Sequence, residues 1–570
     1  MRLNATTGFP FALVAFGIAT RVTAAQLPRE LHLREVFDTT LSPGSAHDYT
    51  LPLASGGSAN IVILQEGVDV VIDLRGPDGN LISTFDSPNG RNGDEPVEIL
   101  STKGGLYSIR VRPFSAREPV GQYRLQVIAV RSAPETAAMM RARQLARDSA
   151  TKWLATRSVP LDAPATVSLD ARMAPLDALV ARANVIGLGE ATHGSREFGD
   201  LRLSLTKRLI TNNGFRIVGI EASASRYELI ARYVAGEAQS YPAGSGPPYN
   251  SWIGSRTQRA LIAWVRGWNL AHPRDRVRIV GLDAQDNQTS RDTLKILLNR
   301  AYGSDIISRL APMFQELAAA DSQTAVFGDS RVDSVSRRSI MEVVAMLYLD
   351  EPALLGRLGA TDLQTARDAA IEVAQFADFN SRGSGALSHS RDWYMAVNLM
   401  GAIERAAPGT KAVFWAHNAH VAHHVGQSIG SRTSGAWLRE MLGCGYAALG
   451  TAFGEGSFVA QIPNDPTDRL AISTLPLSPT ESIDAVLAGV GPQPSLASWG
   501  CAEDSASVPT WLRNSHPMHW VGGLFTPGSA SGDALRAFNL LEAFDAVAYI
   551  PHVTADEMPA NRPLIPARKR

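Results

Sequence analysis

Between Leu31 and Ser132, hydrophobic and polar residues alternate over short runs that are separated by turn sequences. The runs include HDYTLPL, ANIVILQ and GQYRLQVIAV, and the segments between them include PDGN and SPNGRNGD. A period of two between strong turn signals is typical of half-buried β-strands. The pattern therefore predicts a small all-β sandwich domain over residues 28–132, a common size for two packed sheets.

A different pattern follows this region. Residues 133–160 are rich in Ala and Arg and have helical spacing, which predicts a helical linker. From residue 161 to 556, continuous apolar runs such as NVIGL, RIVGI and VRIVGL alternate with segments of helical period. Apolar runs of this kind indicate parallel strands that helices cover on both faces. We therefore predict an α/β domain with a parallel or mixed central sheet over residues 161–556.

Residues 304–379 interrupt the α/β pattern. They contain several Ala- and Leu-rich helical runs and almost no strand signal, so we expect a helical insertion there. The α/β pattern resumes with KAVFWA, YAALGTAF and FDAVAYI. Residues 557–570 are expected to form a tail.

The first 25 residues carry a targeting signal. Arg2 precedes an apolar run from Phe11 to Ala19, and small residues follow before Gln26. This order is typical of a secretory signal peptide, here over residues 1–25. We expect a secreted or periplasmic protein with no membrane contact beyond that segment, because no later apolar run reaches about 18 residues.

Composition narrows the functional classes. The 570 residues include 54 Lys and Arg against 55 Asp and Glu, a formal net charge of -1, so no global basic field favours nucleic-acid binding. The two cysteines, Cys444 and Cys501, exclude zinc fingers and disulfide-dense scaffolds. In an oxidising compartment they can pair, and two buried free thiols are the alternative.

Polar residues follow four of the predicted strands at their carboxyl ends. NVIGLG runs into Glu190, RIVGI into Glu221, and RIVGL into Asp283. The run KAVFWA ends at His417. Because ligands of open α/β sheets bind outside the carboxyl ends of the strands, these groups are expected to line one crevice.

Two short motifs supply the candidate chemistry. In GEATHG, Glu190 and His193 are three residues apart, and a carboxylate beside an imidazole fixes its tautomer and raises its basicity. In WAHNAH, His417 and His420 have the same spacing. Such a set is suited to general acid–base catalysis.

Together these motifs resemble the erythromycin esterase family. GEATHG after a strand, Arg202 on the next helix, Glu221 at the end of the next strand and WAHNAH after a late strand agree with its pattern. The resemblance extends from about Arg141 to Pro551 and includes GLDAQD, SRDWYMAVN and GTAFGEG. The sandwich region resembles the bacterial pre-peptidase C-terminal module, an accessory domain.

The resemblance implies hydrolysis of a carboxylic ester, which in the family is a macrolide lactone. It assigns His193 as the general base that activates water, with Glu190 and Glu221 orienting the base and the water. His417, His420 and Arg202 would bind the substrate carbonyl and stabilise the oxyanion. The implied partner is a small-molecule ester, and no cofactor is required. The expected catalytic residues are His193, Glu190, Glu221, His417 and Arg202, and the expected substrate-binding residues are His420, Asn418, Arg256 and Tyr394.

Three alternatives remain open at this stage. The Glu and His side chains of the same set suit a divalent metal such as Mn²⁺ or Zn²⁺, which would make the protein a metal-dependent hydrolase or protease. The GxSxG pattern at residues 426–430 is that of a serine hydrolase, with Ser428 as the nucleophile. A secreted binding protein without catalytic activity is the third.

Overall fold

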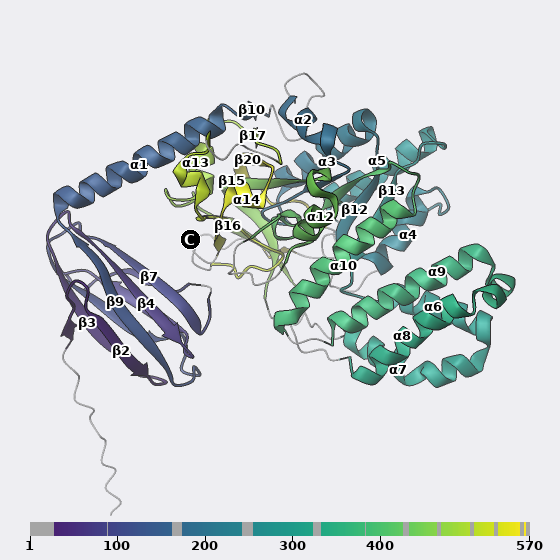
Figure 1. The fold of residues 1–570 in the computed structure, drawn as a ribbon, viewed down its shortest axis with the longest axis horizontal. Coiled ribbons are helices and arrows are strands. Elements are labelled where there is room, and N and C mark those ends of the chain that lie inside the picture. Colours follow the sequence, from purple (N-terminus) through teal and green to yellow (C-terminus); the bar gives the residue numbers. More distant parts are fainter. Residues whose placement is uncertain are drawn as a thin grey trace, which may run out of the picture. The chain divides into compact units, whose positions relative to one another are not determined.

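The computed structural model describes residues 28–87, 89–161, 174–241, 255–322, 332–381, 384–425, 432–463, 465, 469–501, 507–528, 534–558 and 564–565. It forms two compact units, Met1–Arg143 and Gln144–Arg570, drawn in Figure 1. The boundary lies inside helix α1 (Ala133–Ala155). The expected signal peptide, residues 1–25, lies outside the described residues. Among the described helices, none combines the length and apolar character of a membrane span.

The first unit is a β-sandwich, as the alternating pattern predicts. One sheet has five strands in the order β1-β3-β8-β5-β6, and the other has four in the order β2-β9-β4-β7. Inward side chains such as Tyr107 and Tyr123 are buried between them. The strands are β1 (Arg29–Glu30), β2 (Val36–Leu41), β3 (His47–Leu53), β4 (Ser58–Glu66), β5 (Val70–Arg75), β6 (Leu81–Phe85), β7 (Asn92–Leu100), β8 (Gly105–Pro113) and β9 (Gly121–Arg131).

The second unit is built on a mixed sheet of ten strands. Eight of them follow the order β10-β17-β20-β15-β11-β14-β12-β13, and the neighbours from β20 to β13 are parallel. Three other pairs are antiparallel: β10 with β17, β17 with β20, and β16 with β15. The strands are β10 (Ser158–Pro160), β11 (Val185–Leu188), β12 (Phe215–Ser223), β13 (Arg278–Asp283), β14 (Lys411–Trp415), β15 (Tyr446–Gln461), β16 (Leu470–Leu475), β17 (Ser495–Ser498), β20 (Ala546–Val553) and β21 (Leu564–Ile565). A separate pair, β18 (His516–His519) and β19 (Leu535–Phe538), lies outside this sheet.

Helices cover both faces of the parallel strands, which explains why these strands are continuously apolar. In β14, Phe414 packs into one core, and Val413 and Trp415 pack into the other. Helices on the Trp415 side are α2 (Ala174–Arg182), α3 (Arg196–Asn213), α4 (Ala224–Val234) and α5 (Arg256–Ala271). Helices on the Phe414 side include α10 (Ser384–Glu404), α12 (Ser434–Leu442) and α13 (Ile483–Ala488).

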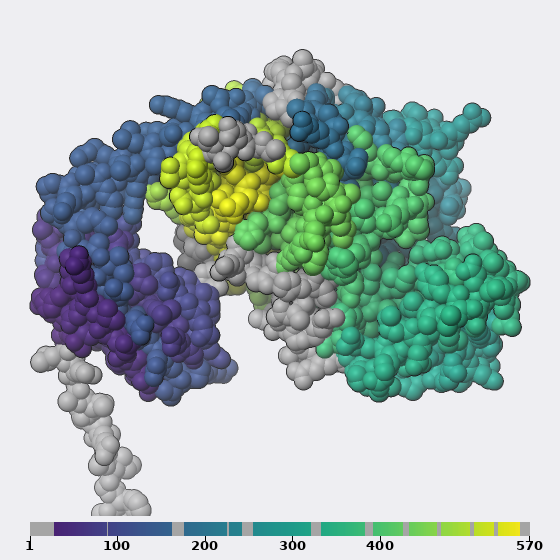
Figure 2. Space-filling view, viewed as in Figure 1, coloured from purple at the N-terminus to yellow at the C-terminus, as the bar shows by residue number. Residues whose placement is uncertain are grey.

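The helical insertion begins earlier than its predicted first residue, 304. Helix α6 (Gln288–Tyr302) packs with α7 (Ser304–Ser322), α8 (Ser334–Leu349) and α9 (Glu351–Phe379) around one core. Leu294 and Leu298 of α6 are fully buried in that core. The teal lobe at the lower right of Figure 2 is formed by these helices. The lobe therefore starts directly after β13.

Two other predicted boundaries differ from the structure. Residues 158–160, expected to end the helical linker, form β10 and pair with β17. Residues 564–565, expected in the tail, form β21 beside β16. Both segments are too short for a periodic signal, and sheet neighbours decide their conformation.

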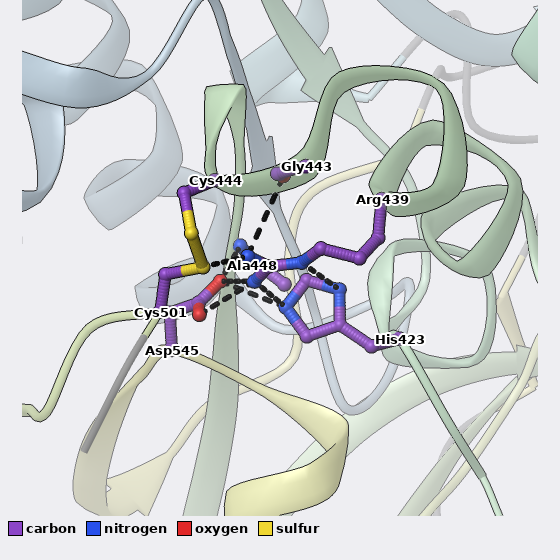
Figure 3. Close-up of a disulfide and its surroundings, with 7 residues drawn as sticks. All are labelled: His423, Arg439, Gly443, Cys444, Ala448, Cys501 and Asp545. Atoms are coloured by element: carbon purple, nitrogen blue, oxygen red, sulfur yellow. Dashed lines mark hydrogen bonds and ion pairs between the residues drawn. A yellow bond between two sulfur atoms is a disulfide. The ribbon is translucent and has the colours of Figure 1, made fainter. Parts of the chain in front are cut away.

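Cys444 and Cys501 form a disulfide, which decides between the two states that the sequence leaves open. The bond joins η4 (Gly443–Gly445) to the segment that follows β17. Figure 3 shows Arg439 beside it, donating to Sγ of Cys501 at 2.6 Å and to the carboxylate of Asp545. The Asp545 carboxylate also lies 2.8 Å from Nε2 of His423. The disulfide is therefore anchored to a buried ion cluster.

Candidate active site

The carboxyl ends of β11, β14, β12 and β13 lie side by side, because these strands are parallel neighbours in that order. β14 comes much later in the chain, yet it lies between β11 and β12. This order brings His417, directly after β14, between Glu190 after β11 and Glu221 in β12. The crevice that the sequence predicts at this sheet edge is therefore assembled from non-consecutive strands.

Glu190 and His193 form a hydrogen-bonded pair. Nδ1 of His193 lies 2.7 Å from Oε1 of Glu190, so the ring donates through Nδ1. Arg202 forms an ion pair with the other oxygen, Oε2, and its guanidinium lies 4.6 Å from the Trp415 ring centre. A carboxylate bonded to Nδ1 fixes the tautomer and the orientation of the ring.

Close backbone packing positions this pair. A Cβ on Gly194 would overlap the backbone of Val459, so only glycine permits that approach. The N–H of Ala191 donates to Oγ1 of Thr451 at 2.8 Å, and the carbonyl of Glu190 accepts from the N–H of Asn418 at 2.9 Å. The GEATHG loop is therefore fastened to both β15 and the loop after β14.

Glu221 is a buried carboxylate with several donors. Oε1 accepts from Arg391 at 2.7 Å and lies 3.1 Å from Nε2 of His420. Oε2 accepts the backbone N–H of His417 at 2.8 Å. Burial by itself raises the pKa of Glu221, but the charges of His420 and Arg391 hold it well below its usual value. Glu221 is thus an ionised anchor for the loop after β14.

His420 lies between two carboxylates. Its Nδ1 is 2.8 Å from Oδ1 of Asp392, and its Nε2 faces Glu221 and, at 3.0 Å, Nη1 of Arg391. Burial lowers the pKa of His420, but Asp392 and Glu221 outweigh burial and the Arg391 charge and raise it to about 10. The raised pKa favours the imidazolium form, in which Nδ1 donates to Asp392.

Arg391 and Asp392 contact the candidate site, and the sequence reasoning did not select them. Arg391 donates to both oxygens of Asp283, at 2.7 to 3.1 Å, in addition to Glu221. Asp392 also accepts from the backbone N–H of Ser434 at the start of α12. Both residues lie in the SRDWYMAVN stretch, which is part of the family resemblance. The sequence analysis assigned no role to these two residues.

His417 faces the protein interior. Nδ1 accepts the N–H of Ala419 at 3.1 Å, and Nε2 lies 3.1 Å from the carbonyl of Val521. Burial, followed by the neighbouring His193 ring, lowers the pKa of His417 to about 3, so the ring is neutral. Its ring centre is 5.3 Å from that of His193. His417 therefore packs beside His193 with its ring nitrogens directed to the backbone, whereas the sequence analysis expected it to bind the substrate carbonyl.

Arg202 also differs from its expected place. It is almost fully buried behind Glu190, where it holds that carboxylate. A guanidinium in this position supports the base pair and does not face a substrate oxyanion. The expectation used only the position of Arg202 along the sequence, and that position does not determine how deeply the side chain is buried.

Three expected substrate-binding residues direct their side chains to partners other than the histidines. Both amide atoms of Asn418 bond to the backbone of Thr451, so Asn418 is a buried structural residue. Arg256 donates to Asp556 and Asp200 and ties α5 to α3 and the C-terminal segment. Tyr394 lies on α10 and donates to Asp378 of the helical lobe.

Several donor atoms of the Glu and His set are engaged within the protein. Both oxygens of Glu190 are engaged by His193 and Arg202, and Nδ1 of His417 accepts a backbone N–H. Both nitrogens of His420 face other charged groups. In the part of the chain that the structure describes, no cluster of three His, Cys, Asp or Glu side chains is arranged to hold a metal. Ser428, the alternative nucleophile, lies outside the described residues.

A comparison with known families identifies the family of the chain. The erythromycin esterase family model matches residues 210–553, more than half of the chain. The chain belongs to the erythromycin esterase family. Erythromycin esterase type I of Escherichia coli is 21% identical over 263 residues, which is 43% of this chain and 64% of that protein. The chain thus matches slightly less than two thirds of that relative's length.

Solved structures of erythromycin esterase relatives and similar proteins share the fold. A Bacillus cereus protein is 22% identical with a TM-score of 0.59, and covers 72% of this chain and 99% of its own. A succinoglycan biosynthesis protein is 20% identical with a TM-score of 0.58, covering 72% and 98%. A histidine-to-asparagine variant of erythromycin esterase EreC, in its open conformation, is 19% identical with a TM-score of 0.53, covering 70% and 98%.

Proposed function

We propose that this erythromycin esterase family member hydrolyses a carboxylic ester by attack of a water molecule that His193 activates. The observation that carries the proposal is the Glu190–His193 hydrogen bond at the carboxyl edge of the sheet. Arg202 holds Glu190 from behind, so the imidazole has a fixed orientation and an anionic partner. General base catalysis by such a pair contributes roughly 10² to 10⁴ in rate.

The proposed reaction has two steps. Water attacks the ester carbonyl carbon while Nε2 of His193 takes one of its protons, and Glu190 stabilises the resulting imidazolium. The tetrahedral intermediate then breaks its bond to the alkoxide, which receives the proton from His193. The products are the carboxylic acid and the alcohol, and no covalent enzyme intermediate forms.

A second group of charged side chains, formed by Glu221, His420 and Arg391, supports this chemistry. Glu221 bonds the backbone of His417, whose ring lies next to His193. His420 and Arg391 keep Glu221 ionised. We propose that this cluster sets the electrostatic potential around His193 and holds the loop after β14 in place. The neutral ring of His417 packs beside His193.

A hydrolysis panel tests which class of ester is the substrate. The names of the relatives favour an ester, including a macrolide lactone. A panel of macrolides and p-nitrophenyl esters is to be assayed with the wild type, His193→Ala and the control His272→Ala, which changes an exposed histidine at the end of α5. Loss of turnover by at least 10² in His193→Ala alone supports the proposal. Full activity of His193→Ala would refute it, and binding without turnover by the wild type would favour a non-catalytic binding protein.

We also propose that the protein is exported to the periplasm or the medium. The signal-like residues 1–25 and the Cys444–Cys501 disulfide support this, because disulfides persist in oxidising compartments. N-terminal sequencing of the protein from a secreting host is expected to begin near Gln26. A mature protein that retains Met1 would contradict it.

A further inference from the structure

A cleft lies in the helical lobe, and none of the site histidines lines it. Residues of α8 and α9, together with Tyr394 of α10, line an open cleft of about 820 Å³. Its walls are mainly apolar, and a polar end is formed by the hydrogen bond from Tyr394 to Asp378. The apolar lining comes from Met341, Val344, Ala345, Ile371 and Ala374.

Helix α8 has two apolar faces, and the lobe needs only one of them for its core. Ile340 and Val343 are buried against the other lobe helices. Met341 and Ala345 lie on the cleft face, where Met341 is 57% exposed. An exposed apolar face that forms a concave wall is typical of a ligand-binding groove.

Helix α10 links this cleft to the candidate active site. Arg391 and Tyr394 are three residues apart, so they lie on the same side of the helix. Arg391 contacts Glu221 and His420 in the active site, and Tyr394 lines the cleft. Three residues correspond to about 4.5 Å along the helix axis. The cleft and the candidate active site thus have side chains within one turn of each other on α10.

The charges of the cleft favour a neutral occupant. Arg337 and Arg338 are balanced by Glu342 and Asp378, and Arg337 pairs with Asp378 at 2.7 Å. We infer that the cleft binds the neutral, apolar part of an ester substrate, such as a long acyl chain or a macrocycle. The inference rests on the proposed ester hydrolysis for the identity of this occupant. The cleft volume lies within the range of about 300–1,000 Å³ that is usual for such ligands.

The test narrows the cleft and compares a short ester with a long one. Ala345→Trp places an indole on the cleft wall, and Ala353→Trp makes the same change at an exposed site on α9 outside it. The measured quantity is the ratio of kcat/KM for p-nitrophenyl decanoate to kcat/KM for p-nitrophenyl acetate. We expect the ratio to fall at least tenfold in Ala345→Trp and to stay at the wild-type value in Ala353→Trp. An unchanged ratio in Ala345→Trp would overturn the inference.

A binding measurement separates this inference from the proposed function. Anilinonaphthalene sulfonate fluorescence is titrated against the full chain and displaced with decanol. Weakening of decanol displacement by at least tenfold in Ala345→Trp alone supports the cleft, even if no ester in the panel is hydrolysed. Equal decanol displacement in both variants would refute the inference. A change of oligomeric state in Ala345→Trp with decanol displacement retained would also refute it, because it would identify the cleft as an interface between copies.

Discussion

Oδ1 of Asp392 lies 2.8 Å from Nδ1 of His420, and the opposite ring nitrogen of His420 faces Glu221. A histidine between two buried carboxylates is held in its charged form. His193, in the neighbouring loop, bonds to one carboxylate, Glu190, which Arg202 neutralises. The two imidazoles thus have different electrostatic surroundings, and this difference separates an anchoring cation from the proposed base.

The charge on His420 makes stability depend on alkaline pH. Its native pKa of about 10 is above the ordinary value of 6.5, so its contribution is fully present below pH 6.5. That contribution is lost as pH rises from 6.5 to 10. We expect the urea midpoint of the wild type to fall over this window and to fall less in His420→Gln, by an amount equivalent to a few kcal/mol at most. Asp392→Asn is expected to shift the fall to lower pH, and identical profiles for all three proteins would contradict the assignment.

Glu190→Gln tests the anionic support of the base. The amide can still accept a hydrogen bond from Nδ1 of His193, but it no longer stabilises the imidazolium. We expect kcat for p-nitrophenyl acetate to fall by roughly 10² to 10⁴, with a small effect on KM. In the His193→Ala background the same change is expected to have no further effect, because the two residues act as a unit. Additive losses would indicate that Glu190 acts independently of His193.

Metal removal is expected to leave the activity unchanged. The oxygen and nitrogen atoms of Glu190 and His417 that could bind a metal are already engaged within the protein. Dialysis against EDTA followed by assay of ester hydrolysis, with and without added Zn²⁺ or Mn²⁺, checks this. Loss on dialysis and recovery with one of these metals would favour a metal-dependent hydrolase.

The disulfide is expected to stabilise the second unit. The bond joins Cys444 and Cys501, 57 residues apart in the sequence. A closed loop of that length corresponds to about 4 kcal/mol from restriction of the unfolded chain. We expect the Cys444→Ser/Cys501→Ser double variant to unfold at a lower temperature by calorimetry, and the wild type with reducing agent to match it. Equal melting temperatures would show that the Arg439–Asp545 cluster holds this segment by itself.

The periodic pattern of the chain predicted its elements well. Alternation predicted the sandwich strands, and unbroken apolar runs predicted β11, β12, β13 and β14 with polar groups at their ends. Both signals come from local chain geometry: a side chain of a strand points to alternate faces, and a strand buried on both faces is apolar throughout. For the same reason the pairing of Glu190 with His193 followed from a spacing of three residues in one loop.

Only the tertiary structure decided which partners surround each charge. The insertion of β14 between β11 and β12 brings His417 and His420 to Glu221, and α10 adds Arg391 to the same carboxylate. The depth of Arg202 and the inward orientation of His417 follow from that packing. A buried carboxylate takes the donors that the fold places beside it, and strand order is a non-local property that periodicity does not encode.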